Sequence, residues 1–283
     1  GQYRIRLNER KMPIPKRVGI VGYGHLGQFL EAAISKREDL EVAFIWNRSP
    51  GALSHLDQRL VCHDLTDFAS FSPDLVVEVA HPDVSKQYGA LFLKEADYLV
   101  GSPTALADAE LEASLRTVAQ SGTRGLYLPA GALWGSMDLR KMADLGTLQG
   151  LKITMKKHPS SFKLKSPLKE LNDGVSGSAV TLYDGPVRGL CPLAPNNVNT
   201  MAAAAVAAHN LGFDGVNGCL ISDPALTDRH IVLVEAEGKG GFRVCTERVN
   251  PAAVGAVTGN ATYNSFLSSV VAAGAMGPGV HLC

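Results

Sequence analysis

The chain has 283 residues, of which 46% are hydrophobic and 19% are charged. This length suits two domains, and the composition allows a sizeable core and excludes wholesale disorder. The 27 basic and 27 acidic residues give a formal net charge of +0. Such a balance does not favour nucleic acid or an anionic membrane as a partner.

Cysteine spacing and apolar runs bear on the compartment. The five cysteines are widely spread and form no CxxC pair, which argues against a disulfide framework and a zinc site, so no metal is expected. No apolar run approaches the roughly 18–20 residues that span a bilayer, and the N-terminus lacks a signal-peptide pattern. We therefore expect a cytoplasmic protein, with residues 1–11 as a leader or an artificial extension.

Strands and helices alternate in the first half of the chain. A buried strand at 17–22 enters a glycine turn, followed by a helix from Leu26 to Ile34 and a second strand at 41–46. This alternation is typical of an α/β, Rossmann-type doubly wound parallel sheet. It continues with strands expected at 75–79, 98–100 and 125–128 and with helices expected at 84–96 and 108–120.

The pattern changes near residues 129–135. An Ala-rich helix, expected at 200–211 and ended by Gly212, interrupts five β-like runs, which predicts an α+β domain with a mixed or antiparallel sheet. A helix expected at 261–273 should return to the first domain. The expected domains are 12–131, completed by 252–283, and 132–251. The five β-like runs are 151–155, 179–183, 218–221, 230–237 and 242–248.

A GxGxxG motif spans residues 22–27. It follows a strand and opens a helix, which is the context of a dinucleotide-binding turn rather than of an ordinary glycine turn. Gly22 permits a tight turn, Gly24 lets the backbone approach a pyrophosphate, and Gly27 lets helix and strand pack closely. The pyrophosphate would then rest at the amino end of the helix, beside His25 and Leu26.

The second strand should end at the adenosine ribose. An NAD-preferring site has Asp or Glu there, whereas this chain has Asn47-Arg48-Ser49. Asn47 can bond a ribose hydroxyl without repelling a 2′-phosphate, and Arg48 and Ser49 could bind one. Alternatively, Arg48 is a solvated surface residue. We predict that NADP is accepted, so that the cofactor is NAD or NADP.

Ala80 and His81 follow the strand expected at 75–79 and precede Pro82. The carboxyl end of a parallel strand faces the ligand crevice, so both residues are candidates for the wall around the nicotinamide ribose. His81 is either a catalytic acid or base or, as we favour, a helix-capping residue or ribose contact.

Four segments of the chain resemble the L-aspartate dehydrogenase family, and more closely its animal aspartate dehydrogenase domain-containing proteins. They are GIVGYG at 19–24, PAGALWG at 129–135, APNNVN at 194–199 and DPALTDRH at 223–230. The resemblance runs from about residue 16 to the end. It implies that His230 is catalytic and that Ala132 and Asn199 contact the dinucleotide. Two departures are a segment one residue shorter between Asp223 and the histidine, and Asn47 in place of an acidic residue.

The residues themselves leave these roles open. Alternation in the run from 230 to 235 places His230, Val232 and Val234 on one face, where an imidazole could transfer protons or serve as a structural strand end. The asparagines of 194–199 are good N-caps for the Ala-rich helix. That thin helix suits close approach to another helix, a subunit or the nicotinamide, or simply core packing.

The resemblance implies NAD(P)-dependent oxidative deamination of L-aspartate to iminoaspartate, which hydrolyses to oxaloacetate and ammonia, and the reverse. The alternatives are a dehydrogenase or imine reductase for another small acid, and a non-catalytic NAD(P)-binding sensor. We expect a homodimer with a small dicarboxylic amino-acid substrate. Cations that could bind its carboxylates are Lys156, Lys157, His158, Lys163 and Arg188.

Overall fold

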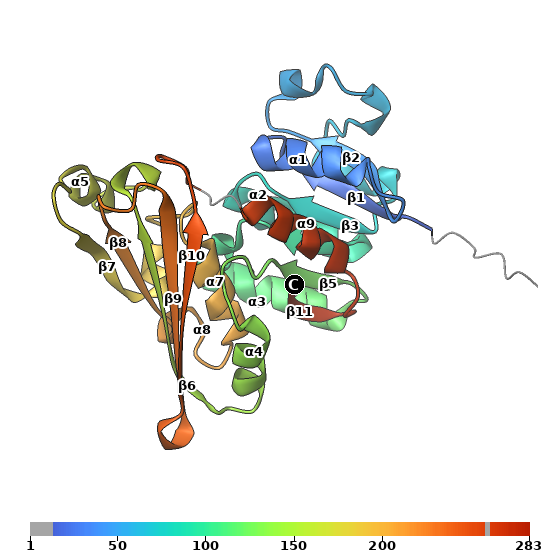
Figure 1. The fold of residues 1–283 in the computed structure, drawn as a ribbon. Helices are drawn as coiled ribbons and strands as arrows, with labels where there is room; N and C mark the ends of the chain where they lie inside the picture. Colours follow the sequence, from blue (N-terminus) through green and yellow to red (C-terminus); the bar gives the residue numbers. More distant parts are fainter. Residues whose placement is uncertain (1–13, 258–260) are drawn as a thin grey trace, which may run out of the picture.

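The structure is a computed structural model that describes residues 14–257 and 261–283. It holds two β-sheets, each with its own helices, which lie side by side in Figure 1. The leader predicted at residues 1–11 lies outside the described residues. Among the described helices, none is both long and apolar enough to cross a membrane.

The first sheet forms from short, almost wholly buried strands, as expected where helices cover both faces. Its six strands are all parallel and lie in the order β11-β5-β4-β3-β1-β2. The strands are β1 (Lys16–Val21), β2 (Leu40–Trp46), β3 (Leu75–Glu78), β4 (Asp97–Val100), β5 (Gly125–Leu128) and β11 (Gly279–Leu282).

Helices pack on both faces of this sheet. α1 (His25–Ile34) and α9 (Thr262–Ala272) share one apolar cluster with β1. α2 (Pro82–Glu95) and α3 (Ala109–Ser121) belong to a second cluster on the opposite face. The second cluster also contains Ile153 of the other sheet, so a continuous apolar core joins the two halves of the molecule.

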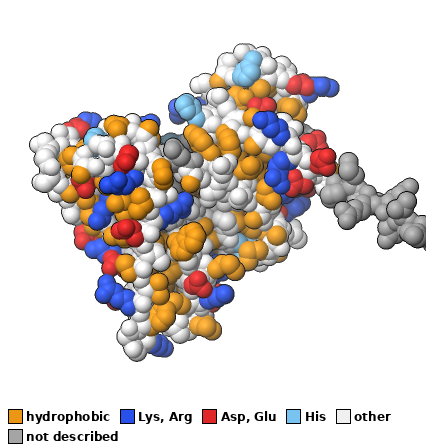
Figure 2. Space-filling view, in the orientation of Figure 1, with side chains coloured by type: hydrophobic (Ala, Val, Ile, Leu, Met, Phe, Trp, Pro, Cys, Tyr) orange, Lys and Arg blue, Asp and Glu red, His pale blue; other side chains and the backbone are white. Residues whose placement is uncertain are grey.

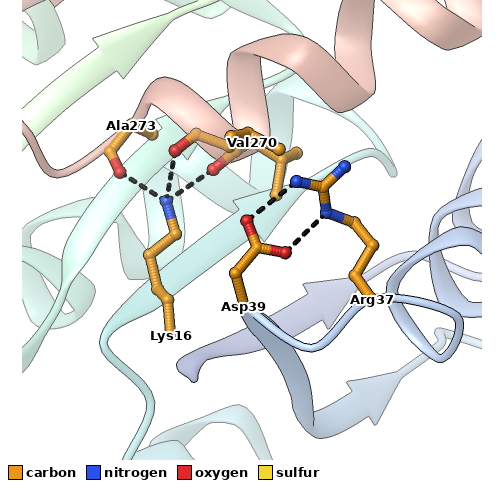
Figure 3. A network of polar contacts seen from close by, with 6 residues as sticks. Lys16, Arg37, Asp39, Val270 and Ala273 are labelled. Carbon is orange, nitrogen blue, oxygen red and sulfur yellow. Dashed lines mark hydrogen bonds and ion pairs between the residues drawn. The ribbon is translucent and has the colours of Figure 1, made fainter. Parts of the chain in front are cut away.

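The C-terminal end of α9 is tied to the start of β1. The Lys16 ammonium donates to the carbonyls of Val270, Val271 and Ala273 at 2.7, 2.9 and 2.7 Å (Figure 3). These carbonyls lie at the end of a helix, where they have no intrahelical partners and carry the negative pole of the helix dipole. The contact fixes α9 on the first sheet, with its opposite end toward the second sheet.

The second sheet is mixed. Its order is β10-β9-β6-β8-β7, in which only β6 and β8 are parallel neighbours. Along β9, alternate residues from His230 to Ala236 are buried, so one face packs inward and the other faces outward. The strands are β6 (Leu148–Lys157), β7 (Val180–Pro186), β8 (Asn217–Ser222), β9 (Arg229–Gly238) and β10 (Arg243–Pro251).

The parallel Rossmann-type sheet and the mixed sheet of a second α+β domain confirm the predicted fold class. The domain boundaries placed at 131 and 251 stay predictions. The helices of this half are α4 (Ser136–Asp144), α5 (Leu168–Asp173), α6 (Val187–Leu190), α7 (Asn199–Ala207) and α8 (Gly212–Gly215). Short 3₁₀ helices are η1 (Pro50–Leu53), η2 (Gln58–Leu60), η3 (Leu65–Phe71), η4 (Pro103–Ala107), η5 (Pro159–Ser161) and η6 (Lys239–Gly241).

The helix expected at 200–211 is shorter than predicted. α7 ends at Ala207, and Gly212 begins α8 in a left-handed conformation with φ +64° rather than ending α7. The chain reaches the surface here, and two polar side chains tie the turn down. His209 Nε2 lies 2.7 Å from Asp144 Oδ1, and Asn210 Nδ2 donates to the Leu148 carbonyl at 2.9 Å. These contacts compete with continuation of the helix.

Candidate active site

The glycine turn between β1 and α1 leaves room for a phosphate. Gly22 has φ +117°, and a Cβ there would lie 2.7 Å from the Val79 carbonyl oxygen. A Cβ on Gly27 would overlap the Gly22 carbonyl, whereas a Cβ on Gly24 would meet nothing within 4 Å. Gly24 caps α1 without a side-chain hydrogen bond, and no acidic residue occupies the first turn, which begins with His25. The turn therefore fits an anionic pyrophosphate at the amino end of the helix.

The end of β2 lies beside the glycine turn. Asn47 Oδ1 accepts from the Tyr23 amide at 3.2 Å, and Asn47 Nδ2 donates to the Ser49 carbonyl at 3.2 Å. Arg48 is exposed and makes no ion pair with the described residues. Asn47 thus stabilises the glycine turn itself. The Arg48 guanidinium lies at the surface, where it can contact a ligand.

A buried carboxylate ends β3. Glu78 is 0% exposed and accepts from the Ala80 amide at 2.7 Å and from the Ser102 amide at 2.8 Å. Burial raises the pKa of Glu78 to about 7. Ala80 was predicted to help form the wall around the nicotinamide ribose, and its amide is already hydrogen-bonded to Glu78. One indication of this buried carboxylate was present in the sequence, because Glu78 is a single acidic residue at the end of an apolar strand.

His81 has the capping role favoured from the sequence. It is the N-cap of α2, and its Nδ1 accepts from the Asp83 amide at 3.2 Å. Pro82 occupies the first turn of the helix, where its missing N–H costs nothing. The His81 side chain is about half exposed (52%) and lies outside the cavity described next.

A cavity of about 270 Å³ lies between the two sheets. Its wall comes from the start of α1, the segment after β5, the start of α7, the inner face of the mixed sheet and the first turn of α9. Of the predicted site residues, it brings together Leu26, Ala132, Asn199 and His230. Those outside its wall are Gly22, Gly24, His25, Gly27, Asn47, Arg48, Ala80 and His81.

Three polar side chains form a row across the mixed sheet in this wall. In the register of the sheet, Lys156 of β6 pairs with Ile231 of β9, so Lys157 and His230 follow as the next residues along each strand. His230 in turn pairs with Asn250 of β10. Lys157, His230 and Asn250 therefore project from three neighbouring strands into one cavity.

His230 is the most unusual member of this row. It is 5% exposed, and its Nε2 has no hydrogen-bond partner among the described residues. Burial and, after it, the neighbouring Lys157 charge together lower the pKa of His230 to about 4, while a backbone contact with Ala256 opposes the shift. The imidazole is therefore neutral near pH 7, and it presents a ring nitrogen to the cavity.

Only one of the five predicted carboxylate-binding cations reaches the cavity. Lys157 lines it and is 5% exposed. Lys156 lies on the other face of β6, and Lys163 is exposed. His158 Nδ1 lies 2.7 Å from Ser160 Oγ, and Arg188 pairs with Asp214 at 2.7 Å.

The asparagines before α7 have roles other than capping. Val198 occupies the N-cap position, and no side chain caps the helix, so the capping prediction for these residues is wrong. Asn197 instead accepts from the Lys163 amide at 2.8 Å and donates to the Ser161 carbonyl at 3.1 Å. Asn199 has a buried Oδ1 without a partner among the described residues, and it lines the cavity.

Several cavity residues were not predicted from the sequence. Asn250 falls just beyond the strand expected at 242–248, and β10 in fact runs to Pro251. Tyr263, Ser265 and Phe266 come from α9, far along the chain from His230. The register of β10 against β9 sets Asn250 beside His230. The packing of α9 against the first sheet brings its first turn to the cavity.

Known proteins resemble both halves of the chain. A family model described as "Aspartate dehydrogenase, C-terminal" matches residues 138–269, and one described as "Homoserine dehydrogenase, NAD binding domain" matches residues 18–129. An aspartate dehydrogenase domain-containing protein of Xenopus tropicalis is 52% identical over 97% of this chain and 99% of its own length. The chain belongs to the aspartate dehydrogenase family. It is an oxidoreductase with a domain that binds a nicotinamide dinucleotide.

More distant members of the aspartate dehydrogenase family share its length and its fold. An L-aspartate dehydrogenase of Nitrosopumilus maritimus is 26% identical over 82% of this chain and 86% of its own. The crystal structure of aspartate dehydrogenase from Thermotoga maritima superposes with a TM-score of 0.69 at 20% identity, covering 92% of this chain and 97% of the other. The two-sheet architecture is thus that of the aspartate dehydrogenase fold.

Proposed function

We propose that this chain catalyses the oxidative deamination of L-aspartate and its reverse. In the forward direction, L-aspartate, NAD(P)⁺ and water give oxaloacetate, ammonium, NAD(P)H and a proton, by way of iminoaspartate. Membership of the aspartate dehydrogenase family supports this reaction. The bound dinucleotide supplies the two-electron oxidation, and the protein supplies binding, orientation and proton transfer.

The observation that carries the proposal is the position of His230. Its neutral imidazole is buried in the cavity between the two domains, with Nε2 unpartnered among the described residues. An ammonium group has no lone pair to form an imine, so the substrate nitrogen must lose a proton before oxidation. In this proposal His230 accepts that proton during oxidation, and in the reverse direction, where ammonia is consumed, its protonated form returns a proton to the amine of the newly formed L-aspartate.

The remaining wall of the cavity suits an anionic substrate. The described residues that line it include no Asp or Glu, and they include four asparagines together with Lys157. Side-chain amides donate hydrogen bonds to carboxylates, and the ammonium adds a charge-assisted contact. A dicarboxylic amino acid matches these groups better than an apolar or cationic one.

For the cofactor, we propose that both NAD and NADP are accepted. The pyrophosphate would lie at the glycine turn, and Asn199 with its unpartnered Oδ1 and Ala132 would face the nicotinamide end. The absence of an acidic residue after β2 and the exposed Arg48 support acceptance of a 2′-phosphate.

The test is to follow oxidation of NADH and of NADPH by the purified protein with ammonia and a series of keto acids. Turnover with oxaloacetate should exceed that with pyruvate or 2-oxoglutarate by at least about 100-fold in kcat/KM, equivalent to about 2.7 kcal/mol. Faster turnover of another keto acid would make the chain a dehydrogenase for that acid. Tight dinucleotide binding without any turnover would instead favour a sensor.

A further inference from the structure

We propose that Lys157 binds a carboxylate of the substrate beside His230, and so makes an anionic group on the substrate a requirement for productive binding. This assignment rests on the proposed function for the identity of the substrate. It does not depend on turnover for its test.

The position of Lys157 is set by the strand it ends. In β6, Ile153, Met155 and Lys157 alternate on the inner face, and the last of these reaches the cavity. The Lys157 ammonium donates to the Val257 carbonyl at 2.9 Å, its one hydrogen bond within residues 14–257 and 261–283. An ammonium has three N–H donors, so two of them can serve a ligand in the cavity.

The charge of Lys157 has no anionic partner in the part of the chain that the structure describes. No ion pair among the described residues includes Lys157, and no described residue in the wall of the cavity is an Asp or a Glu. Keeping an ammonium in such a place costs free energy unless a counter-charge arrives. A substrate carboxylate is that counter-charge.

Binding of an anion at Lys157 would also change His230. The Lys157 charge is the second of the two causes that hold the pKa of His230 low, after burial. A carboxylate against Lys157 would offset this charge and raise the pKa of His230, which makes the imidazole a better proton acceptor. The base would thus be strengthened only when an anionic substrate is in place.

The first experiment measures succinate binding to the complex with NADPH by calorimetry. Succinate carries two carboxylates and no amine, so it probes anion binding without reaction. In Lys157→Gln, succinate should bind at least ten-fold more weakly, with NADPH affinity unchanged. The matched control is Lys156→Gln, from the neighbouring position on the opposite face of β6, and it should bind succinate as the wild type does. Unchanged succinate affinity in Lys157→Gln would overturn the assignment.

A second measurement uses the wild-type protein, so it stands even if the variant fails to fold. Burial lowers the pKa of Lys157 to about 8, so succinate should bind about ten-fold more weakly at pH 9 than at pH 7. The other titratable groups facing the cavity among the described residues are His230, already neutral, and Tyr263. Affinity that does not fall between pH 7 and pH 9 would contradict the proposal.

Kinetics separate this role from a purely structural one. With L-aspartate and NADP⁺, Lys157→Gln should raise the KM for L-aspartate at least ten-fold and should move the acid limb of the kcat/KM profile to higher pH, because the charge beside His230 is gone. A structural role alone would leave that limb in place. If the wild type turns over no oxaloacetate but binds succinate through Lys157, the anion site stands and the proposed reaction fails.

Discussion

The carboxylate-binding role proposed for Lys157 would come with a cost in the stability of the folded protein. Burial lowers the pKa of Lys157 from 10.5 to about 8, so the folded protein favours the neutral amine more than the unfolded chain does. At about 1.4 kcal/mol per pKa unit, burying the charge costs up to about 3 kcal/mol below pH 8. The cost falls as pH rises from 8 to 10.5, because the unfolded chain then binds more protons than the folded protein.

Replacement by methionine should therefore stabilise the protein. Lys157→Met removes the buried charge but also a hydrogen bond of about 1 kcal/mol, so we expect a net gain of about 1–2 kcal/mol at pH 7. Urea denaturation at pH 7 and at pH 9 measures this gain, which should shrink at the higher pH. A loss of stability at pH 7 would show that the contact with Val257 matters more than the charge.

Arg48 is the residue on which acceptance of NADP should depend. It is exposed after β2 and makes no ion pair with described residues, so its guanidinium can bind a 2′-phosphate. Arg48→Gln should raise the KM for NADPH about ten-fold and leave the KM for NADH within about two-fold. Equal effects on both cofactors, or none, would show that Arg48 does not read the 2′-phosphate.

The sequence predicts single residues well where a local pattern constrains them. The glycines at 22 and 27 have the steric environments that the motif requires, and His81 caps the helix that Pro82 opens. The choice of Lys157 among five candidate cations was not predictable in the same way. It needed the end of β6 and the strand register, both of which depend on pairing with β8 and β9.

Among the elements, the turn between β1 and α1 has little room for an added side chain. A Cβ on Gly27 would overlap the Gly22 carbonyl, so Gly27→Ala should push α1 away from the turn. We expect a loss of about 1–3 kcal/mol in unfolding free energy and at least ten-fold weaker dinucleotide binding. Chemical denaturation and a fluorescence titration with NADH measure the two effects.

Gly51→Ala is the matched control for this substitution. Gly51 is exposed in η1, and a Cβ there would meet nothing within 4 Å. The change should alter stability by less than about 0.5 kcal/mol. Wild-type dinucleotide affinity in Gly27→Ala would mean that the turn does not hold the pyrophosphate.

Strong periodicity made some elements predictable, and tertiary contacts decided the others. The strands and α-helices from β1 to β5 lie close to their predicted ranges, because most of them combine a clear apolar pattern with a glycine or proline boundary. The four-residue strand β11 has no such pattern in its sequence, and it forms a strand because it pairs with β5. α7 is buried on all sides from Thr200 to Ala207, so its end is set by contacts of the following turn and not by amphipathicity.

At the scale of the whole molecule, one face bears on the homodimer expected from the sequence. On the outward face of the mixed sheet, Ile231 and Leu233 are half-buried, and they lie among side chains of both charge signs. In the register of this face, Lys152 stands opposite Glu235. A two-fold axis through an apolar centre with mixed charges around it makes such a surface self-complementary. The visible surface in Figure 2 likewise mixes basic and acidic side chains without a field of one sign.

We therefore expect a homodimer in solution. Sedimentation at micromolar concentration should give twice the mass of the chain, and Leu233→Glu should give the mass of one chain, because it places like charges at the centre of the interface. Glu237→Lys, near the end of β9, should leave the dimer intact. A wild-type protein that sediments as a single chain would contradict this expectation.

The cavity exists only in the complete fold, because its wall combines the start of α1, the mixed sheet and the first turn of α9. The central claim is that His230 moves protons in this cavity and does not hold the fold together. Steady-state kinetics of His230→Gln with oxaloacetate, ammonia and the reduced dinucleotide test it most directly, beside a titration of dinucleotide affinity. We predict that kcat falls by about 10²–10⁴-fold while dinucleotide affinity stays within about two-fold of the wild type. A variant that retains wild-type kcat would contradict the account.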